Sequence, residues 1–159
     1  PKCKQKKLTG IAGQKGFCIV SFEKFNINSS LNYLSSVSSI FAKHGVAVEH
    51  IPTGIDNISV VAREVGLNDE ALAEVVKEVS LVLSPDSVRV TRDVALVSIV
   101  GATFDRKAER KVFDEIYSLG TKIYMLNKSA QGLSVIFGFP QKDFERVLKT
   151  LHKNLFCND

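Results

Sequence analysis

Residues 45–61 read GVAVEHIPTGIDNISVV, and residues 120–136 read GTKIYMLNKSAQGLSVI. The two stretches align without a gap at a distance of 75 positions, so the chain contains an internal repeat. The aligned pairs are Gly45 and Gly120, Val48 and Ile123, Ile51 and Leu126, Ile58 and Leu133, Ser59 and Ser134, Val60 and Val135, and Val61 and Ile136. Two copies at this period indicate paired small domains and not a solenoid of many units.

Each copy lies within a longer series of predicted elements. In the first half, the hydrophobic patterns predict strands at 16–22, 46–51, 58–62 and 87–91, a helix from Leu31 to Gly45, and a second helix opened by Asn68 and Asp69. Ser29 or Ser30 is expected to cap the first of these helices. In the second half, the patterns predict strands at 94–100, 122–126 and 133–139, a helix of about 106–119, and a last helix with an apolar stripe at Phe144, Val147, Leu148, Leu151 and Leu155.

The first half therefore has the order βαββαβ, which is the ferredoxin-like arrangement of two helices on one face of a four-stranded antiparallel sheet. The second half lacks its closing strand. Residues 8–12, in contrast, form a predicted strand that is not part of the βαββαβ series of the first half. Because an open sheet edge exposes unpaired backbone groups, we expect the strand at 8–12 to close the second sheet. The expected fold is α+β, with a basic linker at 1–7, a first domain at 15–91, and a second domain made of 8–14 and 92–159.

Composition excludes several classes of protein. The chain has 159 residues, of which 45% are hydrophobic and 24% charged, and no apolar run is long enough to span a bilayer. Cys3, Cys18 and Cys157 are scattered, which fits neither a disulfide framework nor a zinc site, and we expect reduced thiols in the cytoplasm. Since Met125 is the only methionine, we expect the chain to be part of a longer protein.

The motifs of nucleotide chemistry are absent from the sequence. Neither G-x-x-x-x-G-K-[ST] nor G-x-G-x-x-G occurs, and His44, His50 and His152 have no Cys or carboxylate at metal-ligand spacing. Ser59 and Ser134 lack the G-x-S-x-G context of a nucleophile. We therefore expect no catalytic residue, metal site or cofactor on this chain. RNA binding by a ferredoxin-like sheet is a weaker alternative, because LSVIFGF at 133–139 has aromatic residues without the RNA-binding pattern.

One polar cluster fits a small zwitterionic ligand. The loop 26–32 leads into the first predicted helix, whose N-terminal N–H groups suit a carboxylate. Glu49 or Asp56 would hold an ammonium group at the other end of the same ligand. Together these groups suit an amino acid. The alternative is that the serines only cap the helix, that Asp56 only shapes its turn, and that Glu49 is a solvated charge.

FAKHGVAVEHIPTGIDNISVV at 41–61 resembles the first ACT domain of the aspartokinases, close to the monofunctional, lysine-sensitive type. DVALVSIVG at 93–101, LNKSAQGLSVIFG at 126–138 and VLKTLHKNLF at 147–156 resemble the second ACT domain and the C-terminus of that family. The resemblance implies the regulatory region of an enzyme that phosphorylates aspartate with ATP. The catalytic domain, with its ATP and Mg²⁺, is not part of this chain. In the family, one ACT domain is inserted within the other.

The resemblance also implies an effector site, a homodimer formed through the ACT domains, and feedback inhibition by lysine or a related amino acid. Glu49 would bind the ammonium group, and Asn32 stands where the family often has glycine. An ACT sensor attached to a different enzyme is the alternative. By position, and with Asp56 added from the cluster above, the effector-binding residues would be Ile27, Ser29, Ser30, Tyr33, Leu34, Val48, Glu49, Thr53, Gly54 and Asp56.

Overall fold

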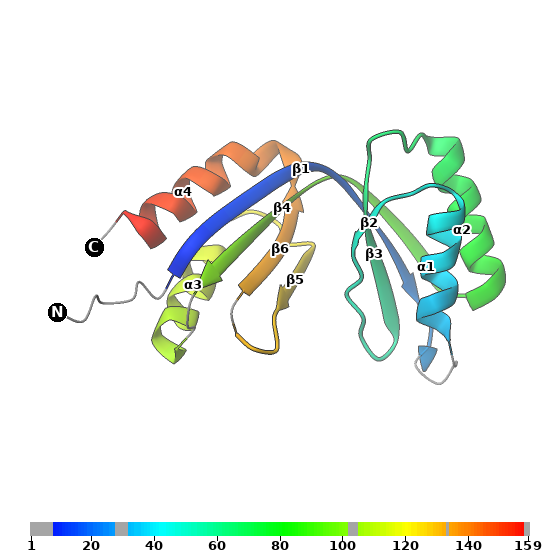
Figure 1. Cartoon of the computed structure of the whole chain (residues 1–159), viewed down its shortest axis with the longest axis horizontal. Coiled ribbons are helices and arrows are strands. Elements are labelled where there is room, and N and C mark those ends of the chain that lie inside the picture. The colour runs from blue at the N-terminus through cyan, green and yellow to red at the C-terminus, as the bar shows by residue number, and fades with distance from the viewer. Residues whose placement is uncertain (1–7, 28–31, 102–104, 133, 158–159) are drawn as a thin grey trace. The chain divides into compact units, whose positions relative to one another are not determined.

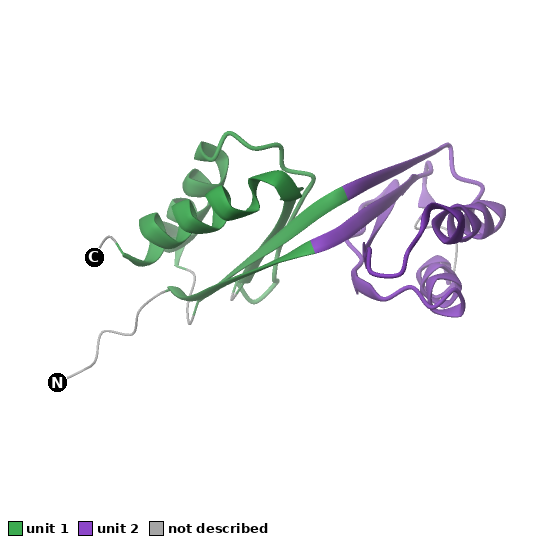
Figure 2. Ribbon diagram, turned by 90° about the horizontal axis from the view of Figure 1, so that it is seen from above, with its two compact units in different colours: residues 1–15, 93–159 green, residues 16–92 purple. Residues whose placement is uncertain are grey.

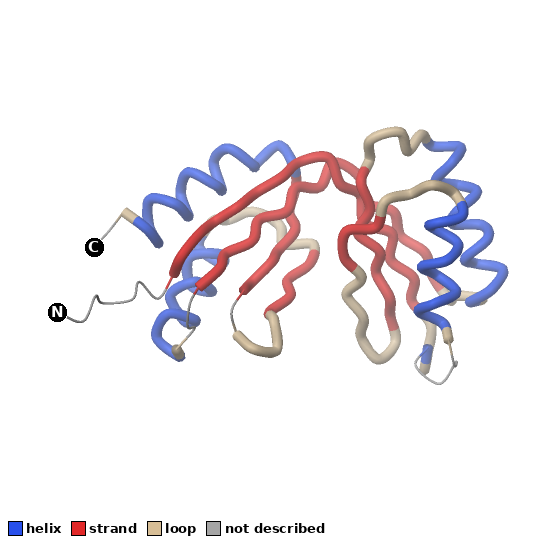
Figure 3. The backbone as a smooth tube through the Cα atoms, in the orientation of Figure 1, coloured by secondary structure: helices blue, strands red, loops and turns tan. Residues whose placement is uncertain are grey.

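The computed structural model describes residues 8–27, 32–101, 105–132 and 134–157. These residues form four α-helices and six strands, and the strand order is β2-β3-β1-β4-β6-β5 (Figures 1 and 3). The prediction of an α+β fold is confirmed. The elements are β1 (Leu8–Glu23), α1 (Tyr33–Lys43), β2 (Val48–His50), β3 (Asn57–Arg63), α2 (Asp69–Leu83), β4 (Ser87–Gly101), α3 (Arg106–Ser118), β5 (Met125–Lys128), β6 (Ser134–Pro140), the short 3-10 helix η2 (Gln141–Asp143) and α4 (Phe144–Phe156).

The chain divides into two compact units (Figure 2). Unit 1 comprises residues 1–15 and 93–159, and unit 2 comprises residues 16–92. β1 and β4 each contribute one part to unit 1 and one part to unit 2. Gly16 in β1 and Asp93 in β4 have positive φ angles of 88° and 54°, so both strands change their backbone conformation where they pass from one unit to the other.

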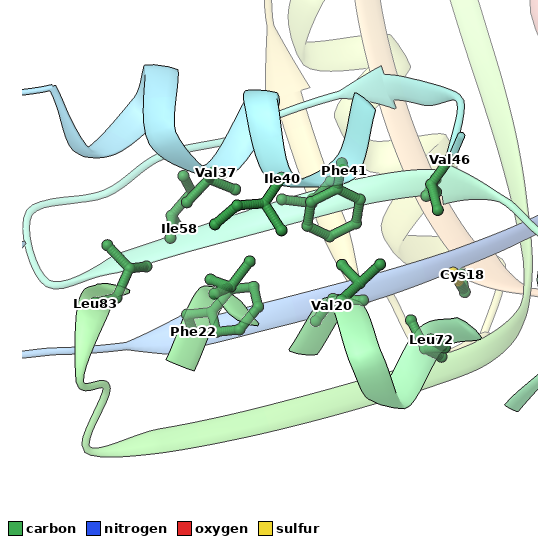
Figure 4. Packing of buried hydrophobic residues seen from close by; sticks show 14 of the residues in the cluster. Cys18, Val20, Phe22, Val37, Ile40, Phe41, Val46, Ile58, Leu72 and Leu83 are labelled. Carbon is green, nitrogen blue, oxygen red and sulfur yellow. The ribbon is translucent and has the colours of Figure 1, made fainter. Parts of the chain in front are cut away.

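Unit 2 builds its core on one face of its sheet. Its strands lie in the order β2-β3-β1-β4, and β1 pairs with β3 in antiparallel register from Phe17 opposite Arg63 to Glu23 opposite Asn57. Alternate side chains of β1 and β3 point toward α1 and α2, because successive residues of a strand face opposite sides. Figure 4 shows this packing, with Phe22, Val37, Ile58 and Leu83 toward one end and Cys18, Val46 and Leu72 toward the other.

Unit 1 has a second core of the same kind. Its strands lie in the order β1-β4-β6-β5, and β4 pairs with β6 in antiparallel register. Residues 8–15 of β1 lie beside β4, where the Thr9 hydroxyl donates to the Val100 carbonyl at 3.1 Å. Leu8 and Ile11 pack against the core that β4, β6, α3 and α4 form. The N-terminal segment is therefore an integral strand of unit 1.

Several boundaries differ from those that the sequence predicts. β1 continues through Gly13 and β4 continues through Arg92, so two pairs of predicted strands are two long strands. α1 begins at Tyr33 with Asn32 at the N-cap, whereas the prediction placed Ser29 or Ser30 there. Ser29 and Ser30 lie outside the described residues. Asn32 has φ 67° and makes no side-chain cap hydrogen bond, so the start of α1 depends on a left-handed backbone and not on a capping serine.

Candidate functional site

The loop after β1 is fastened to the turn between β2 and β3. The backbone N–H of Lys24 donates to the Asp56 carbonyl at 2.9 Å, and that of Asn26 donates to Asp56 Oδ1 at 2.8 Å. Asn26 has φ 56°, a conformation that asparagine tolerates better than most residues. One carboxylate oxygen of Asp56 thus binds the loop that leads toward α1.

The turn itself is held by its own backbone. The Gly54 N–H donates to the Asn57 carbonyl at 2.9 Å, and the Ser59 N–H donates to the Pro52 carbonyl at 2.9 Å. Thr53 pairs with Ile58 as an isolated bridge, which extends the contact between β2 and β3 beyond His50. A Cβ at Gly54 would lie 3.0 Å from the side-chain amide of Asn57, so a larger residue there would require that amide to shift.

The same end of unit 2 exposes large apolar side chains. Phe25 and Ile55, which flank the Asp56 contacts, are 83% and 73% exposed, and Leu34 in the first turn of α1 is 40% exposed. The Phe25 N–H donates to Asp86 Oδ2 at 3.0 Å, and Lys24 Nζ donates to the carbonyl of Leu83 at the end of α2. We call this region, formed by residues 24–27, 33–34, 52–57 and 83–86, the loop end.

The opposite end of unit 2 carries Glu49. Val48 lies opposite Ala62 and His50 lies opposite Val61, so the register shifts by one residue and Glu49 is the extra residue of a β-bulge. The Glu49 carboxylate forms an ion pair with Arg63, at 2.9 Å from Nη2 and 3.1 Å from Nε. The Arg63 guanidinium also lies over the Phe17 ring, 5.6 Å from its centre. We call Phe17, Val48, Glu49 and Arg63 the bulge end.

The structure therefore divides the predicted effector residues between two places. Val48 and Glu49 lie at the bulge end, and Tyr33, Leu34, Thr53, Gly54 and Asp56 lie at the loop end. Ala62, opposite Val48, lies five positions along β3 from Asn57, which corresponds to about 17 Å. Ile27, in the loop after β1, is fully buried and packs in the core of unit 2.

Two residues near this set were missed by the sequence analysis. Arg63 ends an apolar strand, and its position opposite Phe17 could have been found only from the strand register. His50 adjoins Glu49, and its Nε2 atom is buried without a hydrogen-bond partner among the described residues. Burial lowers the pKa of the His50 imidazole, which favours its neutral form. Arg63 at the end of β3 and His50 on the edge strand β2 each add a polar group to this part of the sheet.

The described residues offer binding groups and no cluster for a metal ion. Across residues 8–27, 32–101, 105–132 and 134–157, no group of three or more His, Cys, Asp or Glu side chains could hold a metal. Within the same ranges, none of the helices has the length and apolar character needed to cross a membrane. The aromatic residues expected of an RNA-binding strand are internal, since Phe137 and Phe139 are fully buried and stack at 5.3 Å between ring centres.

Comparisons with known proteins point to one enzyme. No protein-family profile matches the sequence. The chain is 24% identical over 152 residues to aspartokinase 3 of Bacillus subtilis; the match covers 94% of this chain and 34% of that protein. The structure superposes on the aspartate kinase of Clostridium acetobutylicum with a TM-score of 0.85 and 28% identity, over 98% of this chain and 36% of that one.

Two further structures have the same fold at lower identity. The regulatory subunit of aspartate kinase from Thermus thermophilus has a TM-score of 0.73 at 22% identity, and the match covers 94% of this chain and 99% of that subunit. Escherichia coli aspartokinase III, solved in complex with lysine and aspartate, has a TM-score of 0.75 at 23% identity, over 96% of this chain and 34% of that enzyme. The chain is thus related to the aspartokinases, spans about a third of their full length, and has the fold of their regulatory subunit.

Proposed function

We propose that this chain is the regulatory region of an aspartokinase and that it binds an amino-acid effector. The observation that carries the proposal is the match to the Clostridium enzyme, which has 28% identity over 98% of this chain but spans only 36% of the enzyme. Phosphorylation of aspartate by ATP, with the Mg²⁺ that accompanies ATP, would belong to another part of the whole protein. The role of this chain would be feedback control of that reaction.

Within this proposal the two units are ACT domains, the first inserted in the second. The first domain would comprise 15–91, and the second would comprise 8–14 and 92–159. Support comes from the strand orders, because β2-β3-β1-β4 in unit 2 and β5-β6-β4-β1 in unit 1 place corresponding strands in the same sequence. Each unit also has its own core with two helices on one sheet face.

We propose lysine as the first effector to test, in the cytoplasm where the pathway enzymes would act. A related protein, E. coli aspartokinase III, was solved with lysine and aspartate bound. The residues proposed for the effector are Ile27, Ser29, Ser30, Tyr33, Leu34, Val48, Glu49, Thr53, Gly54 and Asp56, with the Glu49 carboxylate on the ammonium group. An effector that favours one state by ~1 to 3 kcal/mol would change activity several-fold to a hundredfold.

The separation of the loop end from the bulge end supports a site shared by two chains. β2 lies at the edge of the sheet, so its outer backbone groups can pair with a second copy. A two-fold axis between antiparallel β2 strands would place the bulge end of one copy beside the loop end of its partner. The two groups of proposed residues would then meet across a homodimer interface, although they lie apart within one chain.

A thermal-shift panel tests the proposal. Lysine, threonine, methionine and diaminopimelate would each be titrated into the purified chain, with size-exclusion chromatography of the same samples. We expect lysine to raise the melting temperature and Glu49→Ala to abolish that increase, since a ligand that binds only the folded state stabilises it. If none of the four amino acids raises the melting temperature, the proposed function is contradicted.

A further inference from the structure

We propose that Arg63 competes with the effector for the Glu49 carboxylate, so that a cationic ligand binds there against the positive charge of a guanidinium from the same chain. This inference rests on the proposed function of Glu49 as the ammonium-binding residue. It adds a competitor to that site, because in the absence of a ligand the Arg63 guanidinium of the same chain pairs with Glu49. The affinity for lysine would then be set by the difference between two ion pairs and not by one.

The geometry shows that one oxygen of the Glu49 carboxylate is already engaged. Arg63 Nη2 donates to Glu49 Oε2 at 2.9 Å, and Arg63 Nε donates to the same oxygen at 3.1 Å. Both distances are within the normal range for charge-assisted hydrogen bonds between guanidinium and carboxylate. A ligand ammonium group that approached Glu49 would therefore meet the positive charge of Arg63, which already lies within hydrogen-bond distance of the Glu49 carboxylate.

The backbone of β2 and β3 positions Glu49 and Arg63 as a pair in the absence of a ligand. The bulge in β2 inserts Glu49 as an extra residue, and a bulge of this kind redirects the side chain that it carries. On the neighbouring strand, the Arg63 N–H donates to the Ala47 carbonyl at 3.0 Å, which fixes the end of β3 against the segment before β2. Phe17 lies opposite Arg63 in the register, and its ring supports the guanidinium at 5.6 Å.

The same pair is exposed enough to be exchanged. The side chains of Arg63 and Glu49 are 39% and 41% exposed, so neither charge is locked in the core. Exposed ion pairs contribute little to stability because water and salt screen them. Removal of the competing guanidinium should therefore strengthen the binding of a cationic ligand by about two- to fivefold.

Competition at Glu49 also predicts selectivity between ligands. Norleucine has the length of lysine without the terminal ammonium group, so it has nothing to exchange for Arg63. Its affinity should not respond to the loss of Arg63. Lysine and norleucine therefore separate an effect on the Glu49 carboxylate from a general change in the shape of the site.

The test is titration calorimetry of lysine and norleucine with the whole chain and four variants. Arg63→Gln removes the competing charge, and Arg63→Lys keeps a charge without the planar fork. Glu49→Gln removes the shared acceptor. Arg92→Gln is the matched control, because Arg92 forms ion pairs with Glu64 at 3.3 Å and Asp69 at 2.7 Å in the same unit and does not contact Glu49. Far-UV circular dichroism of each variant verifies that it is folded.

We expect Arg63→Gln to bind lysine about two- to fivefold more tightly than the original chain, with norleucine and the Arg92→Gln control unchanged. Arg63→Lys should fall between the original chain and Arg63→Gln. If lysine binds the original chain and Arg63→Gln binds it equally or more weakly, Arg63 is not a competitor and the inference is overturned, whereas the proposed function stands. If no variant binds either ligand or any other amino acid of the thermal-shift panel, the proposed function fails and the inference fails with it.

Discussion

The imidazole Nε2 of His44 lies 2.8 Å from Glu78 Oε2 and joins the C-terminal end of α1 to α2. Lys43 Nζ donates to both oxygens of the same carboxylate, at 2.9 Å from Oε1 and 3.0 Å from Oε2. One acidic side chain on α2 thus receives two basic side chains at the last turn of α1, where the helix dipole also favours positive charge. The two helices that cover the core of unit 2 are coupled through this carboxylate.

The hydrogen bond from Lys43, followed by that from His44, holds the pKa of Glu78 below its ordinary value of 4.5. A carboxyl whose pKa is lowered by folding stabilises the folded state above its ordinary pKa, and that contribution is lost as the pH falls through the lowered value. Glu78→Gln should therefore lower the urea midpoint at pH 7 and have a smaller effect near pH 3. Glu74→Gln, an exposed acid on the same helix, is the control. Equal losses for Glu78→Gln at both pH values would show that the ion pairs are not responsible.

The N-cap of α1 gives a second prediction. Asn32 has φ 67° and ψ 11°, a left-handed conformation that asparagine tolerates and glycine adopts freely. Asn32→Ala should lower the free energy of unfolding by about 1 kcal/mol, because a Cβ without a local polar group is disfavoured there. Asn32→Gly should leave it nearly unchanged. Urea unfolding of both variants measures the difference, and equal stabilities would mean that the left-handed cap is not retained in solution.

Two glycines of β1 test whether residues 8–15 are integral to unit 1. A Cβ at Gly13 would lie 2.8 Å from Phe144 Cε2 and 3.2 Å from Val97 Cγ2, whereas a Cβ at Gly10 would meet nothing within 4 Å. Gly13→Ala should destabilise the protein by about 1 kcal/mol through overpacking against Phe144 and Val97. Gly10→Ala should be neutral or slightly stabilising, because alanine restricts the unfolded chain. If the two variants unfold at the same urea concentration, the N-terminal segment does not pack as described.

The sequence predicts the elements whose signals are local. α2 is an example, since its N-cap Asn68 accepts a hydrogen bond from the Ala71 N–H at 2.8 Å, as a capping residue should. Its apolar stripe also becomes its buried face, at Leu72, Val75, Val79 and Leu83. Capping residues and a period of 3.6 act over one or two turns, so they can be recognised without knowledge of the tertiary structure.

The continuity of β1 and β4 depends on contacts that are distant in sequence. Gly13 suggests the end of a strand because glycine often interrupts strands, yet here its missing side chain makes room for Phe144. Gly16 and Asp93 adopt positive φ angles, and the strands β1 and β4 continue past them. Neither fact follows from local pattern, because each requires knowledge of which segments lie side by side.

The arrangement of the proposed site residues does not follow from the sequence. The sequence groups Glu49 and Asp56 with the loop before the first helix in one polar cluster, but the register of β3 places them at opposite ends of unit 2. The pairing of Glu49 with Arg63 arises from a bulge in β2, and a shift of one residue reverses which side chains share a face. The amino-acid sequence alone does not reveal where such a register shift occurs.

The most direct test of the central claim, that unit 2 binds an amino-acid effector, is a titration of the ¹⁵N-labelled chain with lysine followed by NMR of the backbone amides. We expect saturable shifts at the bulge end, along 52–57 and in the loop before α1, with α4 of unit 1 unchanged. The same titration of Glu49→Gln should require a higher lysine concentration. An absence of shifts with lysine, threonine, methionine and diaminopimelate at millimolar concentrations, or shifts confined to unit 1, would contradict the central claim.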